Sequence, residues 1–389
     1  MIYDDFFIQG FEPLKLTVEG LGPFREQTWS FDFTDANNEP CNFFLFMSEN
    51  GRGKTTLLEL MAVLMNMLEH RHLESFGHEG LDRGDGRAQW DIRLRMHRDG
   101  RDENVVLSLL AGSLSEGVFL KVWTEDDLQK VGADSWHRMG FRRRRSARLE
   151  AIGTEDSLVE DFLSAVRSAL AAPPGGFEDN PSMYPTLLYF SAYRNIAPIR
   201  DVERSISRPA DWGYKPVHFF LQEGEQWTKS LDNLLVWLKW LDDGRFERAR
   251  NIINNRVFEG SLKFFKDIQK DPPEAIVVNG DQKHRLDQLS SGEKSLVQLF
   301  LRIGAHMTRN TIILIDEMDI HLHTRWLHRL LNQLKQMAKD LFPGLTIIVS
   351  THSRELLEGF AFEVEEKNLR KGGHIIEPDD PKQPENQPR

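Results

Sequence analysis

Residues 48 to 56 read S-E-N-G-R-G-K-T-T, a segment that could bind the phosphates of a nucleotide. In a loop of the form G-x-x-x-x-G-K-[ST], glycines with positive φ let backbone N–H groups surround the phosphates. Lys54 would reach the β- and γ-phosphates, and the Thr55 hydroxyl would bind Mg²⁺. Ser48 stands where this pattern has its first glycine, so the match is incomplete.

The residues on either side of this loop favour phosphate binding over a chance glycine turn. The run C-N-F-F-L-F-M before it is typical of a buried strand, and T-L-L-E-L-M-A-V-L-M-N-M-L after it has apolar residues at helical spacing. Strand, loop and helix therefore follow in the required order. The predicted nucleotide-binding residues of this loop are Asn50, Gly51, Arg52, Gly53, Lys54, Thr55 and Thr56.

A second candidate is the pair of acids that ends the run T-I-I-L-I-D-E. A buried strand would place Asp316 at its carboxyl end, where it could bind a metal ion, and Glu317 could orient and deprotonate a water molecule. Many strands end in acidic residues, so this pair indicates a nucleotide site only in combination with the phosphate-binding loop. With Thr55 and Asp316 as metal ligands, the sequence predicts ATP and Mg²⁺ as cofactors and ATP hydrolysis as the reaction.

A third candidate is the run L-S-S-G-E from Leu289 to Glu293. The hydroxyls of Ser290 and Ser291, together with the first amides of a following helix, would form an anion site. A plain helix cap, with either serine as N-cap and Glu293 in the first turn, is the alternative, and both can hold together.

This run resembles the signature of the ABC-type ATPases, which is usually L-S-G-G-Q. The resemblance implies that Ser290, Ser291, Gly292 and Glu293 bind the γ-phosphate of ATP held by a second copy of the chain. We therefore expect a homodimer, or a higher homo-oligomer, that closes around ATP.

The same resemblance suggests roles for three further residues. His352 ends the run I-I-V-S-T-H, and its place matches the family's switch histidine, which contacts the γ-phosphate, although a lone histidine is more often structural. Gln89 could be the family's metal-contacting glutamine or an ordinary strand residue. Arg25 could approach the phosphates, as an arginine does in relatives of the SMC type.

The histidines of D-I-H-L-H suggest zinc at first sight, but His321 and His323 give only two ligands in that stretch. We favour the family's loop after the acidic pair, in which residues 319–323 face the partner copy.

The motifs D-E-M-D-I-H-L-H and S-E-N-G-R-G-K-T-T resemble the RecF, SMC and OLD branch of the ABC-type ATPases. The long stretch between the phosphate loop and the signature argues against a transporter, and sustained heptads of a coiled coil are missing. Little chain follows His352, which argues against an OLD-type nuclease. The chain is most similar to stand-alone ATPases of anti-phage systems such as Septu and PARIS, which act with a separate effector, a nuclease or toxin. A RecF-like DNA repair ATPase and a non-hydrolysing ATP-dependent scaffold are the alternatives.

The strands and helices that must position these residues indicate an α/β fold. The resemblance implies an ABC-type P-loop ATPase head with a mixed β-sheet, split by an inserted lobe. We expect the head in residues 1–95 and 275–362, the insert in residues 96–274, and a disordered tail in residues 363–389. Within the insert, a hairpin at Asp99-Gly100 precedes a loop near Pro173. A leucine stripe from residue 231 to residue 241 and a largely helical stretch from residue 246 to residue 268 then follow. The tail is charged and rich in proline.

Composition narrows the class of protein. A chain of 389 residues with 40% hydrophobic and 28% charged residues can bury a sizeable core. Cys41 is the one cysteine, which excludes an internal disulfide, and the acidic start differs from a signal peptide. No apolar run is long enough to cross a membrane. We therefore expect a cytoplasmic protein without membrane contact.

The net charge of −11 means that nucleic-acid binding must be argued from a local patch. The basic run contains Arg142 to Arg145 and Arg148, and it could contact the phosphates of DNA or RNA. A solvated face balanced by the acids at residues 125–127 is the favoured alternative. Trp237 and Trp240 fit core or dimer contacts better than base stacking.

Overall fold

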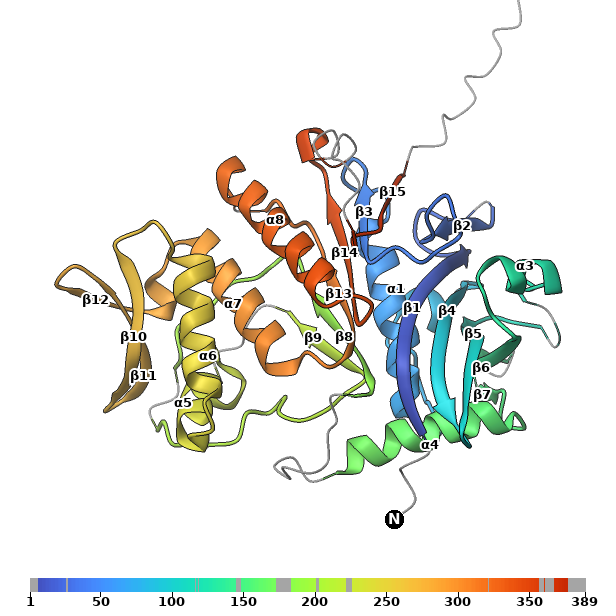
Figure 1. The fold of residues 1–389 in the computed structure, drawn as a ribbon, viewed down its shortest axis with the longest axis horizontal. Coiled ribbons are helices and arrows are strands. Elements are labelled where there is room, and N and C mark those ends of the chain that lie inside the picture. Colours follow the sequence, from blue (N-terminus) through green and yellow to red (C-terminus); the bar gives the residue numbers. More distant parts are fainter. Residues whose placement is uncertain are drawn as a thin grey trace, which may run out of the picture.

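The computed structural model describes residues 6–25, 27–115, 117, 119–144, 148–172, 183–200, 203–221, 226–320, 322–356, 360 and 367–376. Its centre is a parallel sheet with the strand order β15-β3-β14-β13-β8-β9 (Figure 1). The strands are β3 (Phe43–Met47), β8 (Pro185–Phe190), β9 (Val217–Phe220), β13 (Asn310–Ile315), β14 (Leu345–Thr351) and β15 (Lys371–Ile375). Because β3, β14 and β13 are neighbours, the loops after their carboxyl ends meet at one edge of the sheet.

Three helices cover this sheet, namely α1 (Lys54–Asn66), α7 (Ser291–His306) and α8 (Thr324–Asp340). Successive residues of β3 alternate between two cores, so that Phe44 and Phe46 pack with α1 whereas Phe43 and Leu45 pack with α7 and α8. Apolar residues on both faces are what a buried parallel strand requires, and the run that predicted this strand has them. The prediction of an α/β fold is confirmed.

A second sheet, in the order β2-β1-β4-β5-β6-β7, lies on the other side of α1 (Figure 1). Its strands are β1 (Phe6–Glu19), β2 (Trp29–Asp32), β4 (Arg87–Arg98), β5 (Arg101–Gly112), β6 (Ser135–Arg143) and β7 (Leu149–Ile152). The helices around it are α2 (Glu79–Asp82), α3 (Glu125–Lys130) and α4 (Ser157–Ala171). The hairpin expected at Asp99-Gly100 is the β4–β5 turn, where both residues have positive φ.

A smaller lobe packs against α7. It contains α5 (Leu231–Leu241), α6 (Arg245–Ile252) and an antiparallel sheet of β10 (Lys263–Lys270), β11 (Pro273–Asn279) and β12 (Gln282–Arg285). Short turns of other helix types are Met67–Glu69, Trp227–Lys229, Ile253–Val257 and Leu286–Gln288. The leucine stripe is confirmed, because Leu231, Leu234, Leu235 and Leu238 are buried in one cluster. The helical prediction for 246–268 is wrong beyond Phe258, because β10 begins at Lys263 and pairs with β11.

The predicted limits of the insert are also wrong. β8 and β9 fall inside 96–274 yet belong to the central parallel sheet, and β4 runs across the limit at residue 95. The sheet recruits β8 because its residues are fully buried between β13 and β9, a tertiary pairing that the local sequence does not specify. The lobe that projects from the head is therefore the part from α5 to β12.

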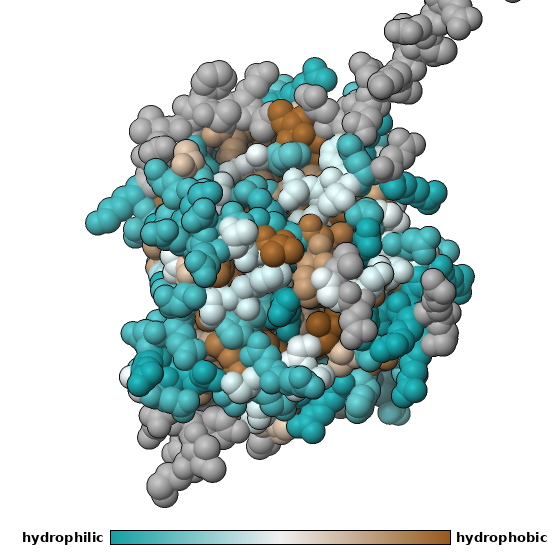
Figure 2. Space-filling model, turned by 90° about the vertical axis from the view of Figure 1, so that its right-hand side faces the viewer, coloured by the Kyte–Doolittle hydropathy of each residue, from teal (hydrophilic) through white to brown (hydrophobic). Residues whose placement is uncertain are grey.

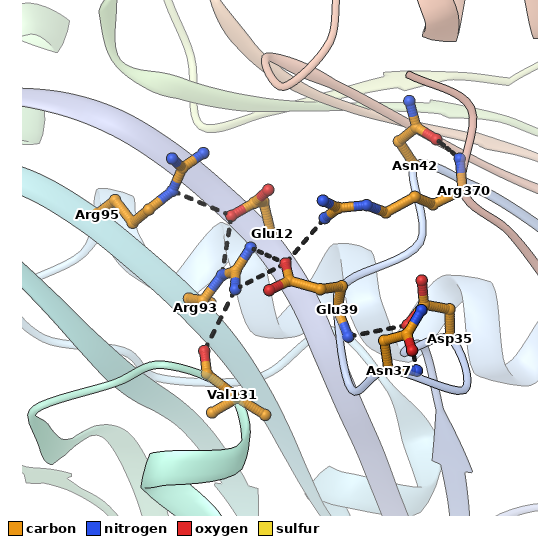
Figure 3. A network of polar contacts seen from close by, with 9 residues as sticks. All are labelled: Glu12, Asp35, Asn37, Glu39, Asn42, Arg93, Arg95, Val131 and Arg370. Carbon is orange, nitrogen blue, oxygen red and sulfur yellow. Dashed lines mark hydrogen bonds and ion pairs between the residues drawn. The ribbon is translucent and has the colours of Figure 1, made fainter. Parts of the chain in front are cut away.

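Part of the predicted disordered tail is ordered, because β15 pairs with β3 at the edge of the parallel sheet. Figure 3 shows what holds the approach to this strand: Glu39 accepts hydrogen bonds from Arg93 (3.1 Å) and Arg370 (2.8 Å). Asn42 donates to the carbonyl of Asn368 at 2.9 Å and accepts from the Arg370 amide at 2.7 Å. These long-range contacts offset the entropy of ordering a polar segment. The last residues of the predicted tail, from 377 on, lie outside the described residues.

Within the described residues, no helix is both long and apolar enough to span a bilayer. The face seen in Figure 2 is largely hydrophilic, and its hydrophobic residues are exposed in small separate areas.

Candidate active site

The loop between β3 and α1 has the geometry that its sequence predicts. Gly51 and Gly53 have positive φ, at 78° and 94°. At Gly53 a side chain has no room, because a Cβ atom would lie 2.6 Å from the ring of Phe24 and 2.7 Å from Pro23. Gly53 also caps α1, and its carbonyl accepts the first helical hydrogen bond, from Leu57, at 3.0 Å. Glycine is therefore required at this position on two grounds.

Lys54 is buried at the mouth of this loop. Its Nζ donates to the carbonyl oxygens of Ser48 (2.7 Å) and Glu49 (3.0 Å), so the ammonium group is held by the loop itself. Burial lowers the pKa of Lys54, while nearby carboxylates, Glu317 foremost, act in the opposite direction. The result is a positive charge placed within the loop that would receive phosphates.

Ser48 fits the position of the missing glycine without strain. It is not among the non-glycine residues with positive φ in the described part of the chain. Its hydroxyl donates to the carbonyl of Glu49 at 2.9 Å and lies 3.2 Å from Lys54 Nζ, from which it accepts a hydrogen bond. A serine here therefore adds a contact to Lys54 that a glycine could not make.

Asp316, at the end of β13, lies beside the first turn of α1. The carboxylate is buried and accepts hydrogen bonds from Thr55 Oγ1 and from Ser350 Oγ, both at 2.7 Å. Two oxygen ligands of one octahedral Mg²⁺ ion, each at about 2.1 Å, would lie about 3 Å apart, so these two oxygens suit that ion. Mg²⁺ typically takes one or two protein oxygens and completes its shell with phosphates and water.

Glu317 adopts a left-handed backbone with φ of 44°, which is unusual for a residue with a Cβ atom. Its N–H donates to Ser350 Oγ at 2.8 Å, and its carbonyl accepts from Arg194 at 3.0 Å. The side chain lines a cavity of about 170 Å³. The other lining residues are Pro23, Gly51, Arg52, Gly53, Lys54, Thr55 and Thr56. The phosphate loop and the predicted base thus share one cavity.

His352 follows β14 and is held by Asp319. Its Nδ1 lies 2.8 Å from Asp319 Oδ2, while Thr351 Oγ1 donates to the other oxygen of that carboxylate at 3.0 Å. The histidine side chain is 51% exposed, so one edge of the ring is free to meet a ligand. Asp319 therefore binds within its own chain and orients the histidine.

The signature segment forms the start of α7. Ser290 is the N-cap, its hydroxyl accepts from the Glu293 amide at 3.4 Å, and Glu293 accepts in return from the Ser290 amide at 3.0 Å. Glu293 is buried and both its oxygens lie 2.9 Å from Lys263 Nζ. Burial would raise the pKa of Glu293, but hydrogen bonds from Lys263 and Ser290 lower it overall. Glu293 thus caps the helix, which leaves Ser291 exposed beside the first amides.

No residue of 289–293 lines the cavity that holds the loop and Glu317. The cavity is also smaller than the 300–1,000 Å³ of typical ligand pockets, so it suits the phosphates rather than the whole nucleotide. The signature and the loop of one chain do not form a common site.

The prediction that Gln89 contacts the metal is wrong. Gln89 is fully buried in β4, where its amide donates to Asp91 Oδ1 and to the carbonyl of Lys121, both at 2.8 Å. The amide oxygen accepts from the Lys121 N–H at 3.1 Å. Both the nitrogen and the oxygen of the side-chain amide therefore have hydrogen-bond partners away from the phosphate loop. Arg25, by contrast, is exposed near the loop.

A zinc site is not supported either. Across the described residues, no group of three or more His, Cys, Asp or Glu side chains could hold a metal ion. His323 is the N-cap of α8, and His321 lies outside the described residues.

The basic run is engaged within the protein. Arg142 and Arg144 pair with Glu150, and Arg143 donates to backbone carbonyls of Leu81 and Gly84. Arg145 lies outside the described residues. These contacts favour a structural role for the described part of the run, although the acid that pairs with it is Glu150 and not one of the expected acids at residues 125–127. The ring of Trp237 stacks on that of Trp240 at 4.8 Å, and Trp240 is 56% exposed.

Sequence reasoning missed two residues that support this site. Ser350 bridges Asp316 and the Glu317 amide, and Arg194 binds the carbonyls of both acids. Ser350 lies near the end of β14, two residues before His352, a spacing that could have suggested it. Arg194 follows β8, a strand that had not been assigned to the head.

The chain is similar in sequence to several known proteins. Residues 196–358 match the family described as "AAA domain, putative AbiEii toxin, Type IV TA system". The Retron Vc95 probable ATPase of Vibrio cholerae serotype O1 biovar El Tor is 20% identical over 376 residues, which cover 80% of this chain. The Septu protein PtuA of Bacillus thuringiensis is 25% identical over 118 residues, or 27% of this chain. These matches show that the chain is similar to an AAA-domain family and to proteins of retrons and of the Septu system.

The chain also shares 30% identity over 100 residues, or 23% of its length, with the Retron Ec83 probable ATPase of Escherichia coli. The chain spans 66% of the Vc95 protein, 28% of PtuA and 18% of the Ec83 protein. Among solved structures, it matches the dimeric post-hydrolysis state of the ATP-binding cassette MJ0796 bound to ADP and Pi. That match has 12% identity, a TM-score of 0.32 and 89% coverage of each chain.

Proposed function

We propose that this chain hydrolyses Mg-ATP in a homodimer that closes around the nucleotide. The observation that carries the proposal is the shared cavity, in which Lys54, Thr55 and Glu317 lie together and Asp316 contacts Thr55. Lys54 would bind the β- and γ-phosphates, and Glu317 would take a proton from the attacking water. His352, oriented by Asp319, would contact the γ-phosphate.

Bound Mg²⁺ would be held by Thr55 Oγ1 and Asp316 and would neutralise charge that develops on the phosphates. Ser350 supports this role, because its hydrogen bond fixes the second oxygen of the Asp316 carboxylate.

The dimer is proposed because one chain leaves the site incomplete. The start of α7 presents Ser291 and free helical amides, an arrangement that attracts anions, yet it lines no part of the phosphate cavity of its own chain. A second copy in a two-fold arrangement would bring its α7 start to the open side of the nucleotide, and the reverse would hold for the other site.

Mixing two inactive variants tests the shared site. Lys54→Ala removes the phosphate-binding charge, and Ser291→Glu places a negative charge at the first turn of α7, where it also favours the helix. Each variant alone is expected to lose turnover. An equal mixture is expected to recover about one quarter of the wild-type phosphate release, because half of the dimers are mixed and each holds one intact site. A mixture that stays inactive, while co-purification of differently tagged copies shows mixed dimers, would contradict the shared site.

We further propose that ATP turnover regulates a separate effector, a nuclease or toxin, in anti-phage defence. The support is the resemblance of the motifs to Septu and PARIS ATPases together with the similarity to retron proteins and to Septu PtuA. Cells that carry this chain with its neighbouring genes are expected to resist phage. Lys54→Ala, at an unchanged protein level, is expected to reduce resistance to that of cells without these genes. Unchanged plaque counts in this variant would argue against regulation by ATP.

A further inference from the structure

Arg194 is a buried charge with an unusual set of partners. It lies four residues after β8 and is 3% exposed. Its guanidinium donates to the carbonyl oxygens of Ser191 (2.7 Å), Asp316 (2.6 Å) and Glu317 (3.0 Å). Its Nε donates to Ser295 Oγ at 3.0 Å. These four acceptors are neutral, although a buried guanidinium normally pairs with a carboxylate.

Keeping a charge in this place is costly. Burial lowers the pKa of Arg194 to about 10, while the carboxylate of Asp316 and its neighbours act in the opposite direction. The side chain therefore stays protonated at neutral pH, in surroundings where an apolar residue would usually stabilise the fold better. A reason beyond stability is needed for its presence.

The backbone of Glu317 supplies that reason. A left-handed conformation costs about 1–2 kcal/mol for a residue other than glycine, so it persists only where the surroundings enforce it. Ser350 binds the N–H of Glu317 and Arg194 binds its carbonyl, so both peptide groups of this residue are fixed. Glu317 lines the phosphate cavity, and these two contacts hold the backbone that carries its side chain there.

Arg194 also reaches the signature helix. Ser295 is buried in α7, one turn after the exposed Ser291 at the start of that helix. Because a helix moves as a rigid element, a shift of the α7 start would shift Ser295 and with it the guanidinium. Arg194 is thus a physical link between the start of α7 and the carbonyl of the predicted base.

We propose that Arg194 is a positioning residue that holds Glu317 in its left-handed conformation and couples that conformation to the start of α7. A nucleotide bound against α7 would fix the position of the helix. Through its contacts with Ser295 and with the Glu317 carbonyl, Arg194 would then hold Glu317 in one position. The inference rests on the proposed function, because Glu317 needs positioning for catalysis only if the chain hydrolyses ATP.

The test compares Arg194→Lys with a matched control, Arg302→Lys. Arg302 is as buried as Arg194 and lies on α7, the helix of Ser295. It pairs with Asp211 at 2.6 Å and with the carbonyl of Lys229 at 2.8 Å. Lysine keeps the charge in both variants, but its donors all lie on one nitrogen, so it cannot span separated acceptors as the planar guanidinium does. For each variant kcat, KM, the Kd of a non-hydrolysable fluorescent ATP analogue and the Tm would be measured.

Arg194→Lys is expected to lower kcat at least tenfold and to leave the Kd of the analogue within about threefold, because the phosphate loop is untouched. Arg302→Lys is expected to lower Tm by a similar amount while kcat stays within about twofold of wild type. A purely structural role of Arg194 would make the two variants alike, which would overturn the inference.

Ser295→Ala keeps the inference testable if Arg194→Lys does not fold. It removes one hydroxyl, and we expect kcat to fall about threefold with unchanged Kd. In a double-mutant cycle, Ser295→Ala is expected to have no further effect in the Arg194→Lys background, because the link is already broken. Additive effects would overturn the coupling. Absence of ATP turnover in the wild-type chain would instead refute the proposed function, so the two failures are distinguishable.

Discussion

Glu317→Gln is expected to lower kcat for ATP hydrolysis by roughly 10²–10⁴-fold, the usual contribution of a general base. The variant should fold normally, because Ser350 and Arg194 bind the backbone of this residue and not its carboxylate. Removing one negative charge beside the phosphates reduces their repulsion, so the variant should also retain bound ATP. We therefore expect a long-lived ATP-bound dimer, seen as a doubled mass in light scattering with Mg-ATP, and no release of phosphate.

The matched control for this prediction is Glu49→Gln, because Glu49 carries an exposed carboxylate within the same loop segment and only its backbone carbonyl contacts Lys54. Its kcat is expected to stay within about threefold of wild type, since an exposed charge is strongly screened. Two results would count against Glu317 as the base: turnover near the wild-type value in Glu317→Gln, or equal losses in both variants. Wild-type protein that dimerises with ATP but releases no phosphate would favour the non-hydrolysing scaffold.

Gly53→Ala is expected to abolish nucleotide binding and to lower the free energy of unfolding by about 2–4 kcal/mol. The alanine would have to adopt φ of 94°, and its Cβ atom would lie 2.6 Å from the ring of Phe24. Either the loop or the aromatic core must move, and a displaced loop cannot direct its amides at a phosphate. Nucleotide titration calorimetry and urea denaturation would measure the two effects.

Gly51→Ala separates the clash from the backbone strain. Gly51 also has positive φ, at 78°, but no atom lies within 4 Å of a Cβ atom built on it. We expect a loss of only about 1 kcal/mol in unfolding free energy from the strained conformation. Equal losses in the two variants would mean that contact with Phe24 plays no part in shaping the loop.

What the sequence predicted well is the local geometry that depends on a few adjacent residues. The loop from Gly51 to Thr55 and the acids after β13 lie where their motifs placed them, because strand, turn and helix are encoded locally. The capping box of α7 is equally local, and both of its residues lie within one turn.

What the sequence could not predict depends on which strands pair. Gln89 follows the loop at the spacing of a metal ligand, yet β4 belongs to the second sheet, where Asp91 and Lys121 occupy its amide. Arg194 became recognisable as part of the site only when β8 was found beside β13. β15 is short and contains two glycines, so its order comes from β3 and from the contacts of Arg370, not from its own propensity.

The order of strands in the parallel sheet bears on when the protein becomes functional during its synthesis. β3 leaves the ribosome well before its neighbours on both sides, β14 and β15, have been made. Until then the strand that carries the phosphate loop has two unpaired edges, and pairing across such a sequence separation is slow. A nascent chain therefore has Lys54 and Thr55 long before it has Asp316 or Ser350 beside them. An incomplete copy cannot assemble the hydrolytic site, and the edges of β3 are where chaperone protection would be needed most.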